Sequence, residues 1–257
     1  MRLQLVNLWL LVRIEFVRSF WFLKRYPLDT ILEFVSFGVI FFFLLGAGQV
    51  VAGTPPTTEG IRQLVLTYIL GFLVLFQVSN PSQTISQESR NGMLEHLFMS
   101  GHPLPVVFIA RAIGGLLTTL LTMGVLAIAL LLLTGTTLNW SALMLLPTIT
   151  MLVSALGLGL ILGGVAILFK KTDSVFFFVQ LLMFALTSSA APVAWWQYIL
   201  PIAPSAGFVR AIANNTAPSL EGLLYVGLSA LVWLVAGVLV FQFGLRLAQQ
   251  RGLLGHE

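Results

Sequence analysis

Few side chains in this sequence could catalyse a reaction or bind a metal ion. The chain has 3 His and no Cys, so it has no thiol nucleophile, disulfide or cysteine zinc site. His96 and His102 lie six positions apart without a third ligand nearby, whereas zinc sites take three or four protein ligands. A nucleophilic serine would need a histidine or carboxylate beside it, and the long apolar segments offer none at their centres. We therefore expect neither a catalytic nor a metal site.

The lysines do not form a phosphate-binding loop. Such a loop places a lysine after a glycine and before a serine or threonine. Here Lys24, Lys170 and Lys171 follow Leu23, Phe169 and Lys170. We expect no cofactor in this chain, and if the protein moves a substrate, the energy must come from another subunit.

The composition predicts an integral membrane protein. Charged residues make up only 9% of the 257 residues, and apolar residues make up 58%. A soluble domain has about 25% charged residues, so most of the surface here would lack side chains suited to water. The net charge of +4 comes from scattered basic residues, which form no nucleic-acid-binding patch. A soluble enzyme, a disordered tail and a nucleic-acid-binding module are excluded.

The apolar runs predict an all-α membrane protein, because a spanning helix needs about 20 mostly apolar residues. We expect one transmembrane domain over residues 1–257 with six spans, of which the first five lie within residues 31–186. The second and fifth are short, and small residues at 187–190 can extend the fifth. The spans are Ile31–Val51, Ile61–Val78, Val106–Leu133, Ala142–Phe169, Val175–Leu186 and Gly222–Leu247.

Residues 1–26 mix apolar and basic side chains. We expect an interfacial helix on the cytoplasmic surface, with its basic side chains reaching the lipid headgroups. The alternative is a solvated arm beside the membrane. If both termini lie in the cytoplasm, all of the 13 Lys and Arg residues except Arg62 and Arg210 lie on the cytoplasmic side. This distribution is the one that the positive-inside rule requires. This arrangement predicts a multi-pass protein of the cell (inner) membrane.

Charge is nearly absent from the predicted spans. Ion-coupled transporters usually keep ionisable side chains at mid-membrane. Here only Glu33 and Arg111 lie inside apolar segments, near their cytoplasmic ends. They could pair with each other or extend separately to the membrane surface. Ion coupling is therefore not expected.

The connection between the second and third spans, residues 80–105, carries the most information. Pro81 marks the predicted exit from the membrane, and Gln87–Met99 has helical periodicity. An apolar patch is formed by Met93, Leu94, Leu97 and Phe98. Polar groups surround it at Glu88, Arg90, Glu95 and His96, and Gly92 interrupts the segment. A short amphipathic helix of this kind either docks on a soluble partner or packs on the cytoplasmic end of its own bundle.

This segment resembles a signature of ABC-2 type permeases, the membrane subunits of ATP-binding-cassette exporters. The run from Glu88 through Gly92 to Leu97, followed by Ser100 and Pro103, is similar to E-x-x-x-G-T-L-E-x-L…S/T-P. It departs from that pattern at Met93 and at the inserted Gly101-His102. The resemblance covers essentially the whole chain. It implies a coupling helix, two copies of an ATP-binding subunit that hold ATP and Mg, and a second permease copy or a relative.

The region before the last span, residues 192–218, is apolar yet interrupted by prolines. Its aromatic side chains, Trp195, Trp196 and Tyr198, suit an outer membrane–water interface. The region resembles the re-entrant hairpin of the same family, in which Pro204 and Arg210 match a proline and an arginine of the family pattern. The alternative is an ordinary aromatic belt on an external loop.

These patterns favour an exporter subunit whose substrate is amphipathic, lipid-like or drug-like. Phe37, Phe41 and Phe177 could line its path, although such residues also face lipid or fill a helix bundle. Gly159 and Gly163 indicate close helix packing. The alternative function is an ATP-independent channel, lipid-modifying enzyme or assembly scaffold.

Overall fold

The computed structural model describes residues 2–53, 55, 57–90, 104–138, 140–169, 173–188 and 195–250. Every regular element within these ranges is helical, which confirms the all-α prediction for them. The elements in chain order are α1 (Arg2–Arg25), α2 (Pro27–Ala52), α3 (Thr58–Arg90), α5 (Leu104–Thr134), η1 (Ala142–Met144), α6 (Leu145–Leu168), α7 (Asp173–Leu186), η2 (Trp195–Ile199), α8 (Ala203–Ala213) and α9 (Leu220–Gln250).

Among the described residues, α2, α3, α5, α6 and α9 are long and apolar enough to cross a membrane. A helix satisfies the backbone hydrogen bonds of such an apolar run within the run itself, as lipid requires. The fifth predicted span is α7, a helix of 14 residues. At 1.5 Å per residue it is about 21 Å long, which is shorter than the hydrocarbon layer.

Helix α6 lies between α3 and α9, and its glycines allow close contact with both. Gly159 and Gly163 face α3, where an added Cβ would meet Pro81 and Ile85. Their predicted role in close helix packing is thereby confirmed within this chain. Gly157 faces the backbone of α9 at Trp233. Small residues at such positions let helix backbones approach each other in a membrane.

Helix α3 continues through Pro81 to Arg90. The predicted exit from the membrane at Pro81 therefore lies inside a helix, and its position relative to the membrane stays a prediction. A proline inside a helix removes one backbone hydrogen bond, but membrane helices tolerate that loss when neighbouring helices support them. Here Gly159 of α6 leaves room for the Pro81 ring. The start of the predicted coupling segment is thus a rigid continuation of a long helix.

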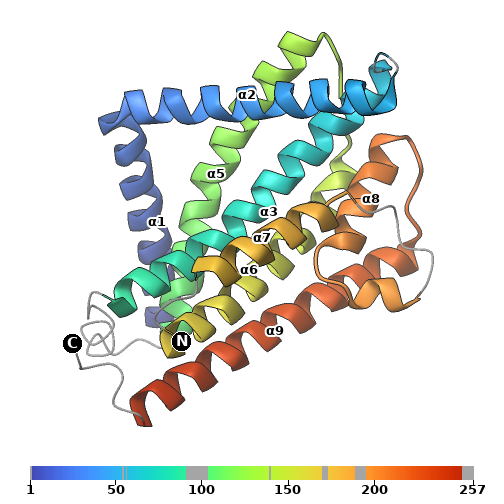
Figure 1. Ribbon diagram of the computed structural model, residues 1–257. Helices are drawn as coiled ribbons and strands as arrows, with labels where there is room; N and C mark the ends of the chain where they lie inside the picture. Colours follow the sequence, from blue (N-terminus) through green and yellow to red (C-terminus); the bar gives the residue numbers. More distant parts are fainter. Residues whose placement is uncertain are drawn as a thin grey trace.

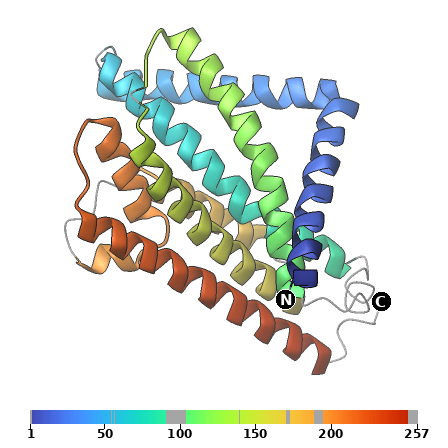
Figure 2. The same ribbon diagram turned by 180° about the vertical axis from the view of Figure 1, so that it is seen from behind.

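Helices α1 and α2 lie at one side of the bundle. They meet in a sharp bend, and α2 lies across the direction of α3, α6 and α9 in both views (Figures 1 and 2). Helix α1 packs against α5, where Gly114 leaves room for the side chain of Glu15. The predicted helix over residues 1–26 is α1, and its position at the membrane surface remains a proposal.

Candidate functional site

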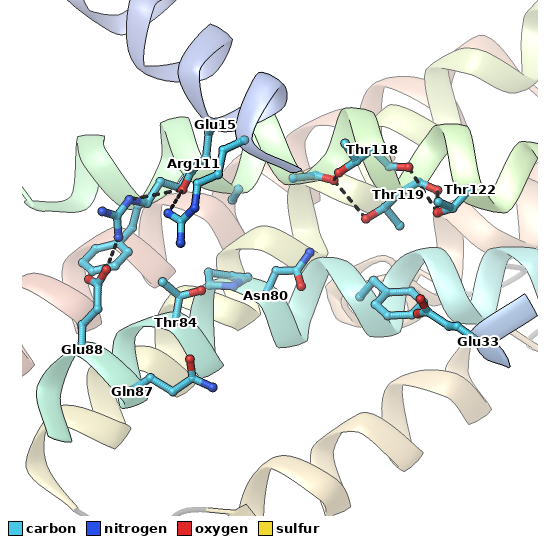
Figure 3. Close-up of a pocket in the computed structure, with 16 residues that line it drawn as sticks. Glu15, Glu33, Asn80, Thr84, Gln87, Glu88, Arg111, Thr118, Thr119 and Thr122 are labelled. Atoms are coloured by element: carbon cyan, nitrogen blue, oxygen red, sulfur yellow. Dashed lines mark hydrogen bonds and ion pairs between the residues drawn. The ribbon is translucent and has the colours of Figure 1, made fainter. Parts of the chain in front are cut away.

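Three charged side chains from three helices meet at one end of the bundle. Arg111 of α5 donates a hydrogen bond from Nη1 to Oε1 of Glu88 on α3. Its Nε lies 3.6 Å from Oε1 of Glu15 on α1. We call Glu15, Glu88 and Arg111 the Arg111 junction. Figure 3 shows Arg111 between the two carboxylates.

The Arg111 junction is largely shielded from water. The side chains of Arg111, Glu15 and Glu88 are 25%, 18% and 13% exposed. Arg18 of α1 lies 3.5 Å from Glu15 and is itself exposed. Breaking such a pair by removing one partner is costly, because the other charge stays buried and uncompensated. The junction therefore joins α1, α3 and α5 as one charged unit.

A cavity of about 650 Å³ opens beside the Arg111 junction, between α1, α2, α3 and α5. Most of the residues that line it are polar or charged (Figure 3). They are Glu15, Arg18, Glu33, Asn80, Thr84, Gln87, Glu88, Arg111, Thr118, Thr119 and Thr122. Such a cavity lies within the usual volume range of ligand-binding sites, about 300–1,000 Å³.

Glu33 and Arg111 could pair with each other or extend separately to the membrane surface, and the structure does not pair them; the separate extension of Glu33, which is exposed on α2, stays a prediction. Arg111 pairs with Glu15 and Glu88, and Glu33 lines the same cavity from α2. Sequence reasoning named Glu88 and noticed Arg111 as a charge in an apolar segment, but it missed Glu15. The isolated position of Arg111 was the available signal.

The Arg111 junction includes Glu88, which belongs to the predicted coupling segment. Glu88 lies two residues before Arg90, where α3 ends. The side chain of Arg90 is outside the described residues, as are the remaining members of the predicted docking set, Gly92, Met93, Leu94, Glu95, His96 and Leu97.

The region predicted as a hairpin contains two short helical pieces, η2 and α8. Trp195 at the start of η2 is 78% exposed. Trp233 of α9 donates from Nε1 to the Ile199 carbonyl oxygen at 3.0 Å, which fixes the end of η2 to α9. Between η2 and α8, Ile202 has a φ of 68°, a left-handed conformation that is uncommon for a β-branched residue.

The other predicted hairpin residues lie close to this turn. Pro204 is buried in the first turn of α8, where proline is favoured. Tyr198 packs its ring near Phe208 and Tyr225. Arg210 donates from Nη1 to the Ser188 carbonyl oxygen at 2.6 Å, and burial lowers the pKa of its guanidinium. Arg210 therefore links α8 to the end of α7.

The three phenylalanines predicted for a substrate path do not lie together. Phe37 packs on Phe72 and Phe76 of α3, and Phe41 is fully buried against Tyr68. Phe177 of α7 is 63% exposed and lies apart from that cluster. In the described parts of the chain, no group of three histidine or acidic residues could hold a metal ion.

A comparison with known protein families identifies the family to which this chain belongs. Residues 7–216 match the model of the ABC-2 type transporter family, which is well over half of the chain. The chain belongs to the ABC-2 type transporter family. Searches of curated proteins and of solved structures gave no significant match.

The resemblance drawn from residues 88–103 is thereby confirmed at the level of the family. The protein is a multi-pass membrane subunit of an ABC transporter, and the family implies association with an ABC ATP-binding subunit. The matched range includes the Arg111 junction, η2 and α8, whereas α9 lies beyond it.

Proposed function

We propose that this ABC-2 permease is half of an exporter that moves an amphipathic, lipid-like or drug-like substrate out of the cytoplasm or inner leaflet. Two ATP-binding subunits hold ATP and Mg, and a second permease copy or a relative completes the membrane part. The N- and C-termini face the cytoplasm of a cell (inner) membrane. The observation that supports this proposal best is the Arg111 junction, because it joins three helices through Glu88, the first residue of the predicted docking segment.

In this mechanism, ATP binding closes the pair of ATP-binding subunits and moves the segment 88–102. Glu88 carries the movement to Arg111 on α5 and then to Glu15 on α1. Since α3 is continuous through Pro81, the same movement tilts α3 as a rigid rod. A change of a few kcal/mol is enough to exchange inward-open and outward-open populations. The hairpin at 192–218 would lie at the outer end of the pathway.

The docking of this segment can be tested with a single cysteine, because the chain has none of its own. In a Glu95→Cys variant, an impermeant maleimide should label the chain in inside-out vesicles and not from the outside. Co-expression of the ATP-binding subunit should slow labelling about tenfold, because a docked helix is removed from water. Labelling is read on a gel as attached fluorescence.

Thr216→Cys is the matched control, since Thr216 is exposed in the loop between α8 and α9. It should be labelled from the outer side and should not be protected by the ATP-binding subunit. Outside labelling of Glu95→Cys would reverse the proposed orientation. Unchanged labelling with the partner bound would remove this segment from the docking surface.

A further inference from the structure

The cavity has a second end, away from the Arg111 junction. Helices α3 and α5 run antiparallel, with Glu88 beside Arg111 and Asn80 beside Gly115. The cavity follows this pair of helices, so its far end lies at Phe76 of α3 and Thr122 of α5. Glu33 of α2 lines this end, one helical turn before the Phe37 ring that packs on Phe76.

The two ends differ in their charge. At the Arg111 junction, the carboxylates of Glu15 and Glu88 are balanced by Arg18 and Arg111. Glu33 is exposed on α2 and has no ion-pair or hydrogen-bond partner within the described part of the chain. A carboxylate in an apolar segment of a membrane helix is costly unless a positive charge or a hydrogen-bond donor approaches it. The far end is thus suited to a cation.

The far end also offers hydrogen-bond acceptors. Thr118 and Thr119 donate their hydroxyl hydrogens to the Gly115 carbonyl oxygen. Thr122 donates to the carbonyl oxygens of the preceding turn. Each hydroxyl oxygen therefore keeps lone pairs for a donor from a ligand. Figure 3 shows these threonines and Glu33 at the same end of the cavity, with Asn80 between that end and Arg111.

Apolar surface completes the lining. Phe76 and Pro81 of α3 and Phe108 of α5 lie along the cavity. An ammonium group has three donors and no acceptor, so it fits a carboxylate flanked by hydroxyl oxygens. A hydrocarbon or aromatic body would fit against the rings. A carboxylate or phosphate ligand would meet Glu33 without a free cation to balance it.

We propose that this cavity binds an amphiphile that carries a protonated amine, with one N–H of the ammonium donated to Glu33 and the remaining donors directed to hydroxyl oxygens among Thr118, Thr119 and Thr122. The assignment deepens the proposed function, on which it rests, by naming the charge class of the substrate. The shared chemistry is an alkylammonium, which a drug-like molecule or an aminated lipid headgroup could supply.

Binding of dansylcadaverine, a fluorescent primary amine, tests the proposal on the full chain in lipid nanodiscs. Its N-acetyl derivative is the matched neutral probe. We expect the amine to bind about tenfold more tightly than the acetylated probe, and Glu33→Gln to abolish this difference. Glu221→Gln, at the exposed start of α9, should bind like wild type. Equal binding of both probes, or an unchanged preference in Glu33→Gln, would overturn the assignment.

Two nanodisc compositions distinguish the ligand sources. If phosphatidylethanolamine occupies the cavity, replacing it by phosphatidylcholine should increase dansylcadaverine affinity in wild type and not in Glu33→Gln. If the substrate is a free amine, the exchange should change nothing. Because no ATP or partner is present, a failure here leaves the proposed ATP-driven role standing. Retained association with the ATP-binding subunit shows that Glu33→Gln is folded.

Discussion

Gly157→Val is expected to lower the Tm of the protein in detergent by about 10 °C. Gly157 of α6 lies against the backbone of α9, where an added Cβ would collide with the carbonyl of Trp233. The same close contact recurs one heptad later, where Gly164 of α6 meets Gly244 of α9. Because the obstacle is backbone, no side chain can move aside, and the helices must separate.

The size of the expected decrease in Tm follows from the loss of packing between α6 and α9. Overpacking a close contact costs about 3 kcal/mol or more when the backbone must shift, and about 3 kcal/mol lowers Tm by roughly 10 °C in a chain of this size. Gly227→Val on α9 is the control, since nothing lies within 4 Å of its added Cβ. Fluorescence-detected gel filtration after heating measures both variants. An equal Tm for Gly157→Val and Gly227→Val would contradict this packing.

Arg111→Met is expected to abolish transport while the ATP-binding subunit still binds. The substitution leaves Glu88, which is 13% exposed, without its cation, and leaves Glu15, which is 18% exposed, with only the exposed Arg18. Removing one partner of such a pair costs about 3 kcal/mol. The coupling account predicts that ATP hydrolysis continues without substrate movement, because the charged link from α3 to α5 and α1 is lost. Transport into inside-out vesicles and ATPase activity are measured together.

A triple variant separates coupling from stability. Combining Arg111→Met with Glu15→Gln and Glu88→Gln removes all the charges, so no uncompensated buried charge remains and stability should recover. Transport should stay absent, because the charged link is still missing. If transport recovers together with Tm, the Arg111 junction has only a structural role. Arg18→Met is the control, since Arg18 is exposed and contacts only Glu15 among these residues.

The helices themselves could be predicted from the sequence because long apolar runs allow little else. The runs that begin at Ile31 and Gly222 are helical in the structure. The course of α3 could not be predicted, since Pro81 normally ends a helix and its tolerance here depends on Gly159, a residue of another helix. Whether a helix continues through a proline thus depends on its contacts with other helices and not on the local sequence pattern alone.

Some residues of the candidate site could likewise be predicted from the sequence, and others could not. Glu88 belongs to a segment with a recognisable pattern, and Arg111 is conspicuous as a charge among apolar residues. Glu15 carries no local signal, because its role depends on the packing of α1 against α5 at Gly114. The spacing of Gly159 and Gly163 predicted close packing, but only the structure identifies α3 as the partner of this pair and α9 as the partner of Gly157.

The most direct test of the account is purification of the tagged protein from its native membrane in mild detergent, followed by an ATPase assay. We predict that an ABC ATP-binding subunit co-purifies with ATPase activity, and that replacing Met93 and Leu94 by Asp removes it while the permease stays folded. Purification of the chain alone, without ATPase activity under several mild conditions, would contradict the role of an ATP-driven permease subunit.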